Sequence, residues 1–319
     1  MIAATSSSSN IPLALMELPS RPLRAGEVRV RVRAVGVNPV DWKMRGTRGP
    51  LGIAQRLVGP SGPLVVGVDF AGEVTERAAD VTDLAIGARV VGGTDFSRGQ
   101  RGSYADEVVV RPDQCAALPE GVSFEDAACL PIPGVTAHRA LTEVGRIGAR
   151  AGQRVLVLGA SGGVGLFAIQ LARTLGAEVV GVCSARNAGV VSRLGATPID
   201  YAAGDPLAAA RALGRYDLVL NAVGSEAYPT AACRALLTPT GALALVPVSP
   251  RDYPDVLLRR AHVLLGRPSR ARLEPLVDLM ARGALEAVIA ERVPLAEAER
   301  AHALSRAGRV VGKLVLSVP

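Results

Sequence analysis

Aromatic side chains and lysines are both scarce in this sequence. Phe, Trp and Tyr together make up 3% of the 319 residues, and Lys43 and Lys313 are the only lysines among 36 basic residues. Arginines scattered along the chain therefore supply almost all of the positive charge behind the formal net charge of +7. A nucleic-acid interface needs clustered basic charge interleaved with aromatic rings. The composition thus argues against a nucleic-acid partner and suits an anionic small molecule better.

Cysteine is also rare, with four residues at irregular spacings and no CxxC pair. This pattern excludes a small disulfide-stabilised scaffold and indicates a reducing compartment. Hydrophobic residues make up 49% and charged residues 20% of the chain, proportions typical of a globular protein. At about 150 residues per domain, the length predicts two domains, each large enough to bury a core.

Only one long apolar stretch without charges occurs, at residues 155–172. Glycines at 159, 162, 163 and 165 interrupt it, which favours a buried strand, a tight turn and a helix over a membrane span. The first residues lack the basic segment and the continuous apolar run of a secretory signal. We therefore expect a soluble cytoplasmic protein with no membrane partner.

Two kinds of apolar pattern divide the chain. Short β-type runs separated by turn residues fill the first part, at 28–35, 64–68, 72–74, 89–92 and 104–110. Strands then alternate with helices, with strands expected at 154–158, 178–183, 197–200, 217–223, 242–248 and 263–266. The intervening helices are expected at 124–128, 135–143, 164–175, 188–194, 206–212 and 227–237. The serine run at 6–9 is expected to be a loop.

The alternation predicts an α/β protein with a doubly wound parallel sheet. After a helix at 272–280 the tail returns to β-type runs at 287–293 and 309–318, around one helix at 295–305. These final strands are expected to rejoin the first domain. We therefore predict a barrel-like β-domain formed by residues 1–122 and 269–319, and a nucleotide-binding domain formed by residues 123–268.

The strongest local signal is a glycine turn between the strand at 154–158 and the following helix. It reads AxGxxG, with Ala160, Gly162 and Gly165 at the motif positions and Ser161, Gly163 and Val164 between them. In a dinucleotide site the middle glycine lets the backbone approach the pyrophosphate at the helix N-terminus, and the last glycine allows the helix to pack closely on the strand. A turn that serves packing alone is the alternative.

The end of the second strand indicates which dinucleotide fits. An NAD site has Asp or Glu there, about 20 residues after the turn, to bind the ribose hydroxyls. Here the strand at 178–183 is followed by Ser184 and Arg186 instead of a carboxylate. A hydroxyl and a guanidinium suit a 2′-phosphate, which indicates NADPH; a solvated surface arginine is the alternative for Arg186. Tyr201, after the third strand, is expected either to flank the same pocket or to pack in a loop.

Several further motifs occur in order along nearly the whole chain. They are GEV at 26–28, GVNPVDWK at 36–43, GVDFAG at 67–72, GSYA at 102–105, LPEG at 118–121, GVTA at 134–137 and GKLVL at 312–316. Together with the glycine turn they resemble the medium-chain dehydrogenase/reductase superfamily, specifically its zinc-independent quinone oxidoreductase and enone reductase branch. The resemblance implies a GroES-like β-barrel catalytic domain, a Rossmann domain, NADPH as hydride donor, and a homodimer joined through the edges of the nucleotide-binding sheets. It also implies cofactor contacts for Thr136 and Lys313.

The zinc-dependent branch of this superfamily requires a catalytic Cys and a Gly-His-Glu sequence in the first domain. At the corresponding places this chain has Val37-Asn38 and Gly67-Val68-Asp69. Its cysteines and histidines never fall at metal-ligand spacing. We therefore expect no metal, and interpret each cysteine as a small buried residue.

Hydride addition to an enone or a quinone needs no metal, because negative charge develops on a conjugated carbonyl oxygen that hydrogen-bond donors can stabilise. The resemblance places residues 38–43 beside the nicotinamide, with Asn38 touching substrate or ribose. Lys43 stands where relatives often have a tyrosine and is the candidate donor; an exposed loop lysine is the alternative. Asp41 is expected to be structural, and Trp42 either to anchor the loop or to line the pocket.

The sequence therefore predicts an NADPH-dependent reductase whose partner is a small-molecule conjugated carbonyl, either a quinone or an α,β-unsaturated ketone or aldehyde. An enoyl-thioester reductase of lipid or polyketide biosynthesis is a second hypothesis, although the sequence shows no docking motif for an acyl carrier. A catalytically idle NADPH-binding protein with a structural or partner-binding role is a third. The scattered arginines and the intact glycines argue against this third hypothesis.

Overall fold

The computed structural model describes residues 1–6, 11–45 and 63–319. This part of the chain separates into two compact units, the first made of Met1–Ile132 and Arg267–Pro319 and the second of Pro133–Gly266. The loop prediction for the serine run is wrong at Ser6, which pairs with Leu64 as the last residue of a strand, and the rest of the run lies outside the described residues, as do residues 46–62. Within the described ranges no helix is both long enough and apolar enough to cross a membrane.

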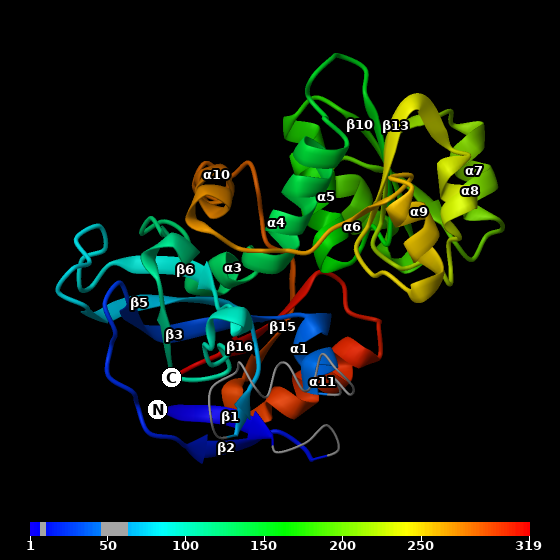
Figure 1. The fold of residues 1–319 in the computed structure, drawn as a ribbon. Helices are drawn as coiled ribbons and strands as arrows, with labels where there is room; N and C mark the ends of the chain where they lie inside the picture. Colours follow the sequence, from blue (N-terminus) through cyan, green and yellow to red (C-terminus); the bar gives the residue numbers. More distant parts are fainter. Residues whose placement is uncertain (7–10, 46–62) are drawn as a thin grey trace. The chain divides into compact units, whose positions relative to one another are not determined.

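A seven-stranded mixed sheet forms the centre of the first unit (Figure 1). In spatial order its strands are β15 (Ile289–Pro294), β16 (Lys313–Ser317), β3 (Val28–Val37), β5 (Asp69–Arg77), β6 (Arg89–Gly93) and β8 (Cys115–Ala117), and β7 (Glu107–Val110) pairs with β3. The pairing of β15 with β16 is parallel, whereas each successive pairing from β16 through β3, β5 and β6 to β8 is antiparallel. Because β16 lies between β15 and β3, the C-terminal segment completes this sheet.

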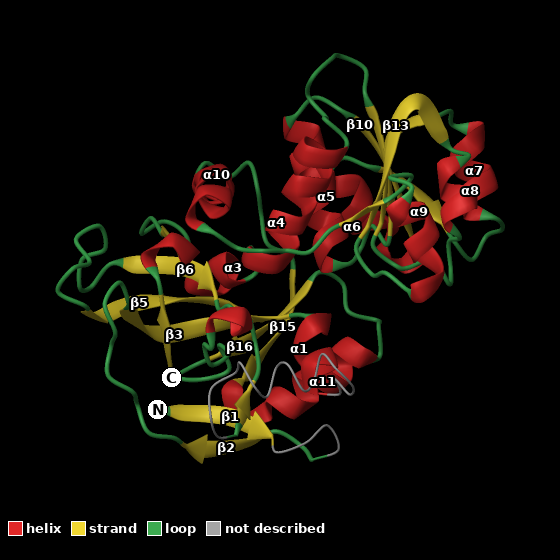
Figure 2. Ribbon diagram, viewed as in Figure 1, coloured by secondary structure: helices red, strands yellow, loops and turns green. Residues whose placement is uncertain are grey.

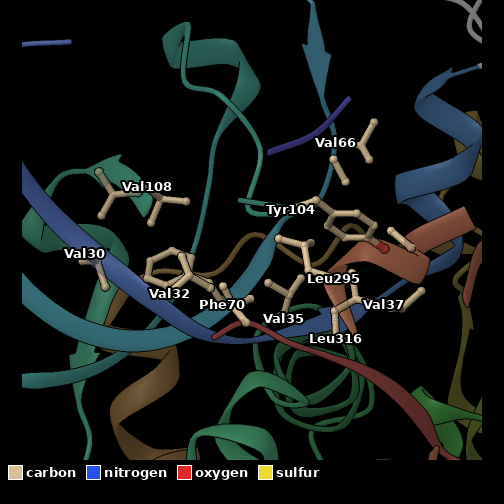
Figure 3. Close-up of a cluster of buried hydrophobic side chains, with 14 of the residues drawn as sticks. Val30, Val32, Val35, Val37, Val66, Phe70, Tyr104, Val108, Leu295 and Leu316 are labelled. Carbon is tan, nitrogen blue, oxygen red and sulfur yellow. The ribbon is translucent and has the colours of Figure 1, made fainter. Parts of the chain in front are cut away.

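The alternation along β3 explains how this sheet buries one face. Val28, Val30 and Val32 are fully buried, and the arginines between them point the other way. Figure 3 shows β3 side chains beside Phe70 of β5 and Leu316 of β16. Tyr104 lies in the same cluster and is fully buried, so its hydroxyl needs a hydrogen-bond partner inside the core.

Shorter elements complete the first unit. A small sheet consists of β2 (Ala14–Glu17), β1 (Ile2–Ser6) and β4 (Leu64–Val65). The helices and 3-10 turns are α1 (Pro39–Arg45), α3 (Phe124–Ala128), α10 (Arg270–Ala281), α11 (Ala298–Arg306), η1 (Phe96–Arg98), η2 (Pro112–Gln114) and η6 (Leu295–Glu297). The sequence analysis did not predict β1, β2, β8 or α1. These elements are too short for a period to be visible, and all four residues of β2 are exposed.

The second unit contains a six-stranded parallel sheet. In spatial order its strands are β11 (Thr197–Asp200), β10 (Glu178–Cys183), β9 (Arg154–Leu158), β12 (Tyr216–Asn221), β13 (Leu237–Leu245) and β14 (His262–Val263). Numbered along the chain this order is 3-2-1-4-5-6, the doubly wound order of dinucleotide-binding domains. The order reverses between β9 and β12, and ligands bind beside the carboxyl ends of the strands at such a reversal. The predicted fold class is therefore confirmed.

Helices cover both faces of this sheet, with α5 and α6 on one face and α7 and α8 on the other (Figure 2). The helical segments of this region are α4 (Pro131–Arg139), the π-turn η3 (Ala140–Val144), α5 (Gly163–Thr174), η4 (Ala185–Asn187), α6 (Ala188–Arg193), α7 (Pro206–Ala212), α8 (Thr230–Arg234), η5 (Pro250–Asp252) and α9 (Tyr253–Leu257). Three strands match their predicted bounds, whereas the helix predicted at 227–237 shortens to α8 and α9 was not predicted. The helix α8 starts after Pro229, and Leu237 already pairs with Tyr216 as the first residue of β13.

Candidate active site

The glycine turn after β9 has the geometry of a phosphate-binding turn. Gly159 adopts a positive φ of 83°, a conformation that glycine tolerates and other residues rarely adopt. A Cβ on Gly165 would lie 2.4 Å from the carbonyl oxygen of Gly159, so only glycine lets α5 pack this closely on the turn. Ala160 is fully buried, and its N–H donates to the carbonyl of Val182 in the neighbouring strand. The first and last residues of the turn are therefore used for packing.

Gly162 differs from these residues because the space in front of it is open. A Cβ built on Gly162 would meet only the carbonyl oxygen of Gly159, at 3.4 Å. Gly162 is also the N-cap of α5, so no side chain caps the helix. The first-turn N–H groups, including those of Gly163 and Val164, together with the positive end of the helix dipole, suit an anionic group here.

The loop after β10 adds a hydroxyl and a guanidinium. The Ser184 Oγ atom is buried and has no hydrogen-bond partner within the described part of the chain, which is unfavourable for a hydroxyl unless a ligand or another group supplies one. Arg186 is exposed and lies in η4. The Nδ2 group of Asn187 donates to Ser161 Oγ at 2.9 Å, so this loop is tied directly to the glycine turn.

The structure adds a carboxylate to this region that the sequence analysis missed. Asp200 ends β11, and its Oδ1 accepts from the backbone N–H groups of Ala185 and Ala202, each at 3.1 Å. The pairing of β11 with β10 brings Asp200 beside the loop that follows β10. The alternation of strands and helices in the sequence is enough to expect such a pairing. The next residue, Tyr201, has a side chain that is 54% exposed, and its N–H donates to the carbonyl of Cys183. The Asp200 carboxylate thus holds two neighbouring loops together.

These residues fit a dinucleotide phosphate group. The helix start is open, the hydroxyl of Ser184 lacks a partner, and Arg186 is exposed on the same loop. Thr136, for which the resemblance implied a cofactor contact, lies in α4 with 1% of its surface exposed. Its contact with a cofactor stays a prediction.

In the first unit, Asn38 is fully hydrogen-bonded inside the protein. Its Nδ2 group donates to the carbonyl of Gly36 at 3.1 Å and to Asp69 Oδ2 at 2.8 Å, and its Oδ1 accepts from Lys313 Nζ at 2.6 Å. Only 3% of the residue is exposed. Both amide hydrogens are used, so in this arrangement Asn38 has no donor for a substrate oxygen. This differs from the substrate contact expected from the sequence.

Lys313 also lies in a different environment from the one expected. It is 4% exposed, and Nζ donates to the carbonyl of Val37 at 2.7 Å as well as to Asn38. Its Nζ lies 3.9 Å from Asp69 Oδ2. In this arrangement the ammonium is directed to protein oxygens, and not to a cofactor as the resemblance implied.

Asp41 connects the start of α1 to the core, in line with the structural role expected for it. Its Oδ2 accepts from the N–H of Asn38 at 2.7 Å and from the hydroxyl of Tyr104 at 3.2 Å. Burial raises the pKa of Asp41 and that of Asp69 to about 7, and the positive charge of Lys313 opposes the rise. The first unit therefore holds two buried carboxyl groups that change protonation near neutral pH.

Lys43 is exposed on α1, with Nζ 5.5 Å from the centroid of the Trp42 ring. The Trp42 Nε1 group donates to Ser305 Oγ at 3.2 Å and thereby anchors α1 to α11. Trp42 therefore has an anchoring contact, one of the two roles considered for it. Lys43 is an exposed residue, and its catalytic role stays a prediction.

The cysteines and acidic residues do not form a metal site. All four cysteines are buried, and burial raises the pKa of Cys115, Cys129 and Cys233 to about 12. Among the described residues no three His, Cys, Asp or Glu side chains come together as a ligand set. The positions at which zinc-dependent relatives have Cys and His hold Asn38 and Val68, and a valine supplies no ligand atom. The donor set therefore does not fit zinc.

Comparison with known proteins agrees with this architecture. Residues 24–120 match the alcohol dehydrogenase GroES-like domain, and residues 194–316 match the family described as zinc-binding dehydrogenase. A quinone oxidoreductase from Pseudomonas aeruginosa is 32% identical over 312 residues, which cover 91% of this chain and 90% of that protein. The chain belongs to the quinone oxidoreductase branch of the medium-chain dehydrogenase/reductase family. It is thus a member of a family of oxidoreductases that use pyridine nucleotides.

Two further relatives show the range of this family. The structure of the quinone oxidoreductase from Coxiella burnetii superposes with a TM-score of 0.88 at 31% identity, covering 100% of this chain and 98% of that one. Erythronolide synthase EryA2 from Saccharopolyspora erythraea is 35% identical over 310 residues, which cover 94% of this chain but only 8% of the synthase. The same fold therefore occurs in a separate quinone oxidoreductase and within a much larger synthase.

Proposed function

We propose that this protein is an NADPH-dependent reductase of conjugated carbonyl compounds, either quinones or α,β-unsaturated ketones and aldehydes, and that it works without a metal. The observation that supports this most directly is the loop after β10, where the unpartnered Ser184 hydroxyl and the exposed Arg186 take the place of a ribose-binding carboxylate. The relatives named as quinone oxidoreductases support the class of substrate.

The choice of NADPH over NADH rests on charge. A 2′-phosphate accepts charge-assisted hydrogen bonds from a guanidinium, and Arg186 has no acidic partner among the described ion pairs. Asp200 is an acidic residue that contacts this loop, but its Oδ1 already accepts two backbone N–H groups. We therefore propose that Asp200 holds the two neighbouring loops together and that Arg186 binds the 2′-phosphate of NADPH.

Bound NADPH supplies the hydride in this reaction. The ammonium of Lys43 donates to the carbonyl oxygen of the substrate, where negative charge develops as the hydride adds to a conjugated carbon. The contact between Trp42 and Ser305 keeps α1, and with it Lys43, in one position. Asn38 has no free donor, so it supports α1 and does not hold the substrate oxygen.

Reduction of an enoyl thioester is the second candidate. The match to a segment of erythronolide synthase EryA2 supports it, because that segment belongs to a much larger biosynthetic protein. Both activities need the same hydride donor and the same stabilisation of an enolate oxygen. They differ in the substrate, which a direct assay distinguishes.

The assay measures NADPH and NADH consumption with a panel of quinones, enones and enoyl thioesters, before and after exhaustive treatment with a metal chelator. We expect turnover of a quinone or an enone with NADPH, unchanged by the chelator. Preferential turnover of enoyl thioesters would select the second candidate. A stoichiometric metal whose removal abolishes turnover would contradict the metal-free proposal, and no consumption with any substrate would favour a catalytically idle protein.

We also propose a homodimer and a cytoplasmic location. The strand β14 is an edge of the sheet in the second unit and pairs only with β13 within the described chain. Leu257, Leu258 and Leu265 near this edge are 82%, 60% and 58% exposed. An open strand edge beside exposed leucines suits a two-fold contact with a second copy. Location varies within the family, since a Danio rerio relative, 31% identical over 92% of this chain and 84% of its own length, is named as mitochondrial.

A further inference from the structure

Lys313 reaches the interior of the first unit from the first residue of β16. The preceding residue, Gly312, has a φ of 75°, and a Cβ there would lie 2.1 Å from the carbonyl oxygen of Val288. The N–H of Lys313 donates to that same carbonyl at 2.9 Å. Glycine at 312 therefore permits a close backbone approach, and the lysine side chain that follows it is directed inward.

Three oxygen atoms surround the ammonium. Nζ of Lys313 donates to the Val37 carbonyl and to Asn38 Oδ1, and lies 3.9 Å from Asp69 Oδ2. The Asp69 carboxylate accepts in turn from Asn38 Nδ2 at 2.8 Å and from the N–H of Ile132 at 3.0 Å. Asp69 is fully buried, and within the described chain Lys313 is its only ion-pair partner. The ammonium of Lys313, the amide of Asn38 and the carboxylate of Asp69 thus form one cluster, in which each group contacts the other two.

This cluster occupies a defined place in the fold. The resemblance implies that positions 38 and 68 are those at which the zinc-dependent branch has its Cys and His, and here neither Asn38 nor Val68 suits a metal. The positive charge at this place comes from a side chain on another strand, because β16 pairs with β3 and puts Leu314 opposite Val37. A lysine one residue before Leu314 therefore meets the residue that follows Val37.

We propose that Lys313 is a positioning residue whose ammonium is the fixed cation of the catalytic unit, in place of the metal of the zinc-dependent branch. It acts through Asn38, the residue just before α1. Lys313 holds Oδ1 of Asn38, while the Asn38 carbonyl accepts from the N–H of Asp41 at 3.0 Å. The ammonium thus fixes the start of the helix on which Lys43 lies. The effect of Lys313 on catalysis rests on the proposed function. The position of its positive charge inside the first unit is independent of that function.

The first test observes the ammonium directly and needs no substrate. The chain has only two lysines, so labelling lysine with nitrogen-15 gives at most two side-chain ammonium signals. The Lys43→Arg variant lacks the signal of Lys43, so the signal that remains belongs to Lys313. We expect the remaining signal to come from a charged ammonium that exchanges slowly with water at neutral pH. If the remaining signal comes from a neutral amine, or from an ammonium that exchanges with water as fast as that of Lys43, the proposal is wrong. This outcome does not depend on which substrate the protein reduces.

The second test separates positioning from stability. Lys313→Met keeps the length of the side chain and removes the charge. We expect kcat to fall about tenfold or more, because misplacement of a donor costs rate, while the dissociation constant of NADPH stays nearly unchanged. Lys313→Met combined with Asp69→Asn also removes the carboxylate that is ion-paired with the ammonium, so its melting temperature should recover in part toward that of the wild type while kcat stays low.

Arg309→Met is the matched control, since Arg309 is an exposed cation in the same segment. It should change neither kcat nor the melting temperature. Full kcat in a folded Lys313→Met variant would overturn the positioning role. A large loss of NADPH affinity at unchanged kcat would also overturn it, and would return Lys313 to the cofactor contact that the resemblance implies. If the wild type reduces no substrate, the proposed function fails, but the signal and the melting temperatures still test the buried cation.

Discussion

The Nε2 atom of His302 lies 3.1 Å from the hydroxyl oxygen of Tyr104, although 198 positions separate the two residues in the sequence. On the other side of the ring, Nδ1 lies 3.2 Å from Nη1 of Arg45, which can only donate. The imidazole is therefore neutral, with Nδ1 accepting and the Nε2–H group donating to Tyr104, whose hydroxyl donates to Asp41. Burial lowers the pKa of His302 to about 4, in agreement with this assignment. Since Arg45 occupies Nδ1, the ring cannot pass on a proton, and it supports Asp41 instead.

Tyr104→Phe should lower the free energy of unfolding by about 1–3 kcal/mol, because it leaves the Nε2–H of His302 without a partner in the core and removes one of the two hydrogen bonds that Asp41 Oδ2 accepts. Urea denaturation measures this change. Tyr253→Phe is the control, since Tyr253 is 55% exposed and should show no effect. If Tyr104→Phe is as stable as the wild type, these hydrogen bonds do not stabilise the core.

The stability of the protein should fall as the pH rises toward 7. The pKa of Asp41 and that of Asp69 are about 7 in the folded state, against 3.8 for an exposed carboxyl group. Between these values the folded state holds protons that the unfolded state has released, so each group removes up to about 1.4 kcal/mol of stability per pH unit. His302 acts in the opposite direction below pH 6.5, because its folded pKa is lowered and the unfolded state binds the extra proton. The net decrease should therefore correspond to about one proton between roughly pH 5 and 6.5, and it should weaken above pH 7, where both carboxyl groups are ionised in the folded state as well.

Asp41→Asn tests this dependence, since an amide oxygen can accept the same two hydrogen bonds without titrating. We expect its curve of unfolding free energy against pH to be flatter than that of the wild type between pH 5 and 7.5, by up to about one proton. Glu120→Gln, at an exposed carboxyl group, is the control and should leave the curve unchanged. Parallel curves for Asp41→Asn and the wild type would show that Asp41 is ionised throughout this range.

Arg186→Ala should weaken NADPH binding about tenfold to a hundredfold, the effect of losing one charge-assisted contact of roughly 1.5–3 kcal/mol. NADH binding should stay nearly unchanged, because NADH has no 2′-phosphate. Titration of both cofactors by fluorescence measures this. Arg211→Ala, at an exposed arginine in α7, provides the control. Equal losses for the two cofactors would contradict the assignment of Arg186 to the phosphate.

Lys43→Ala should lower kcat about 100-fold, the usual effect of losing one donor to a developing oxyanion. The dissociation constant of NADPH should not change, since Lys43 is assigned to the substrate oxygen. Lys43→Arg should restore little activity, because a planar guanidinium does not replace a compact ammonium. Steady-state kinetics with the best quinone or enone would decide. A Lys43→Ala variant with full turnover would identify Lys43 as a surface lysine without a catalytic role.

Leu258→Asp combined with Leu265→Asp should convert a dimer to a monomer, because two carboxylates would be placed beside the exposed edge at β14. Analytical ultracentrifugation measures the mass in solution. Leu213→Asp is the matched control, since Leu213 is also in the second unit, is 45% exposed and follows α7. A wild type that sediments as a monomer would contradict the proposed dimer. A double variant that remains dimeric would place the contact at another surface.

The sequence alone determined the features that depend on local pattern. The strand at 154–158, the glycine turn and the helix after it are visible because an apolar run, a glycine spacing and a helical period follow one another within about 20 residues. The position of Ser184 and Arg186 directly after the next strand could be predicted for the same reason, whereas their role in cofactor binding stays a prediction. The alternation of strands and helices also determined the doubly wound sheet, because parallel neighbours need a crossover between them.

Only the tertiary structure decided how the polar side chains of the first unit are used. Asn38 and Lys313 are 275 positions apart, and their contact depends on the register of β16 against β3. The sequence shows an amide and a lysine, and each was assigned to a ligand. Burial adds partners that the sequence does not show, because a buried donor or acceptor must be satisfied in the core, and the partners here are side chains and the carbonyls of Gly36 and Val37. Long-range register and burial set these hydrogen bonds, and neither has a local pattern in the sequence.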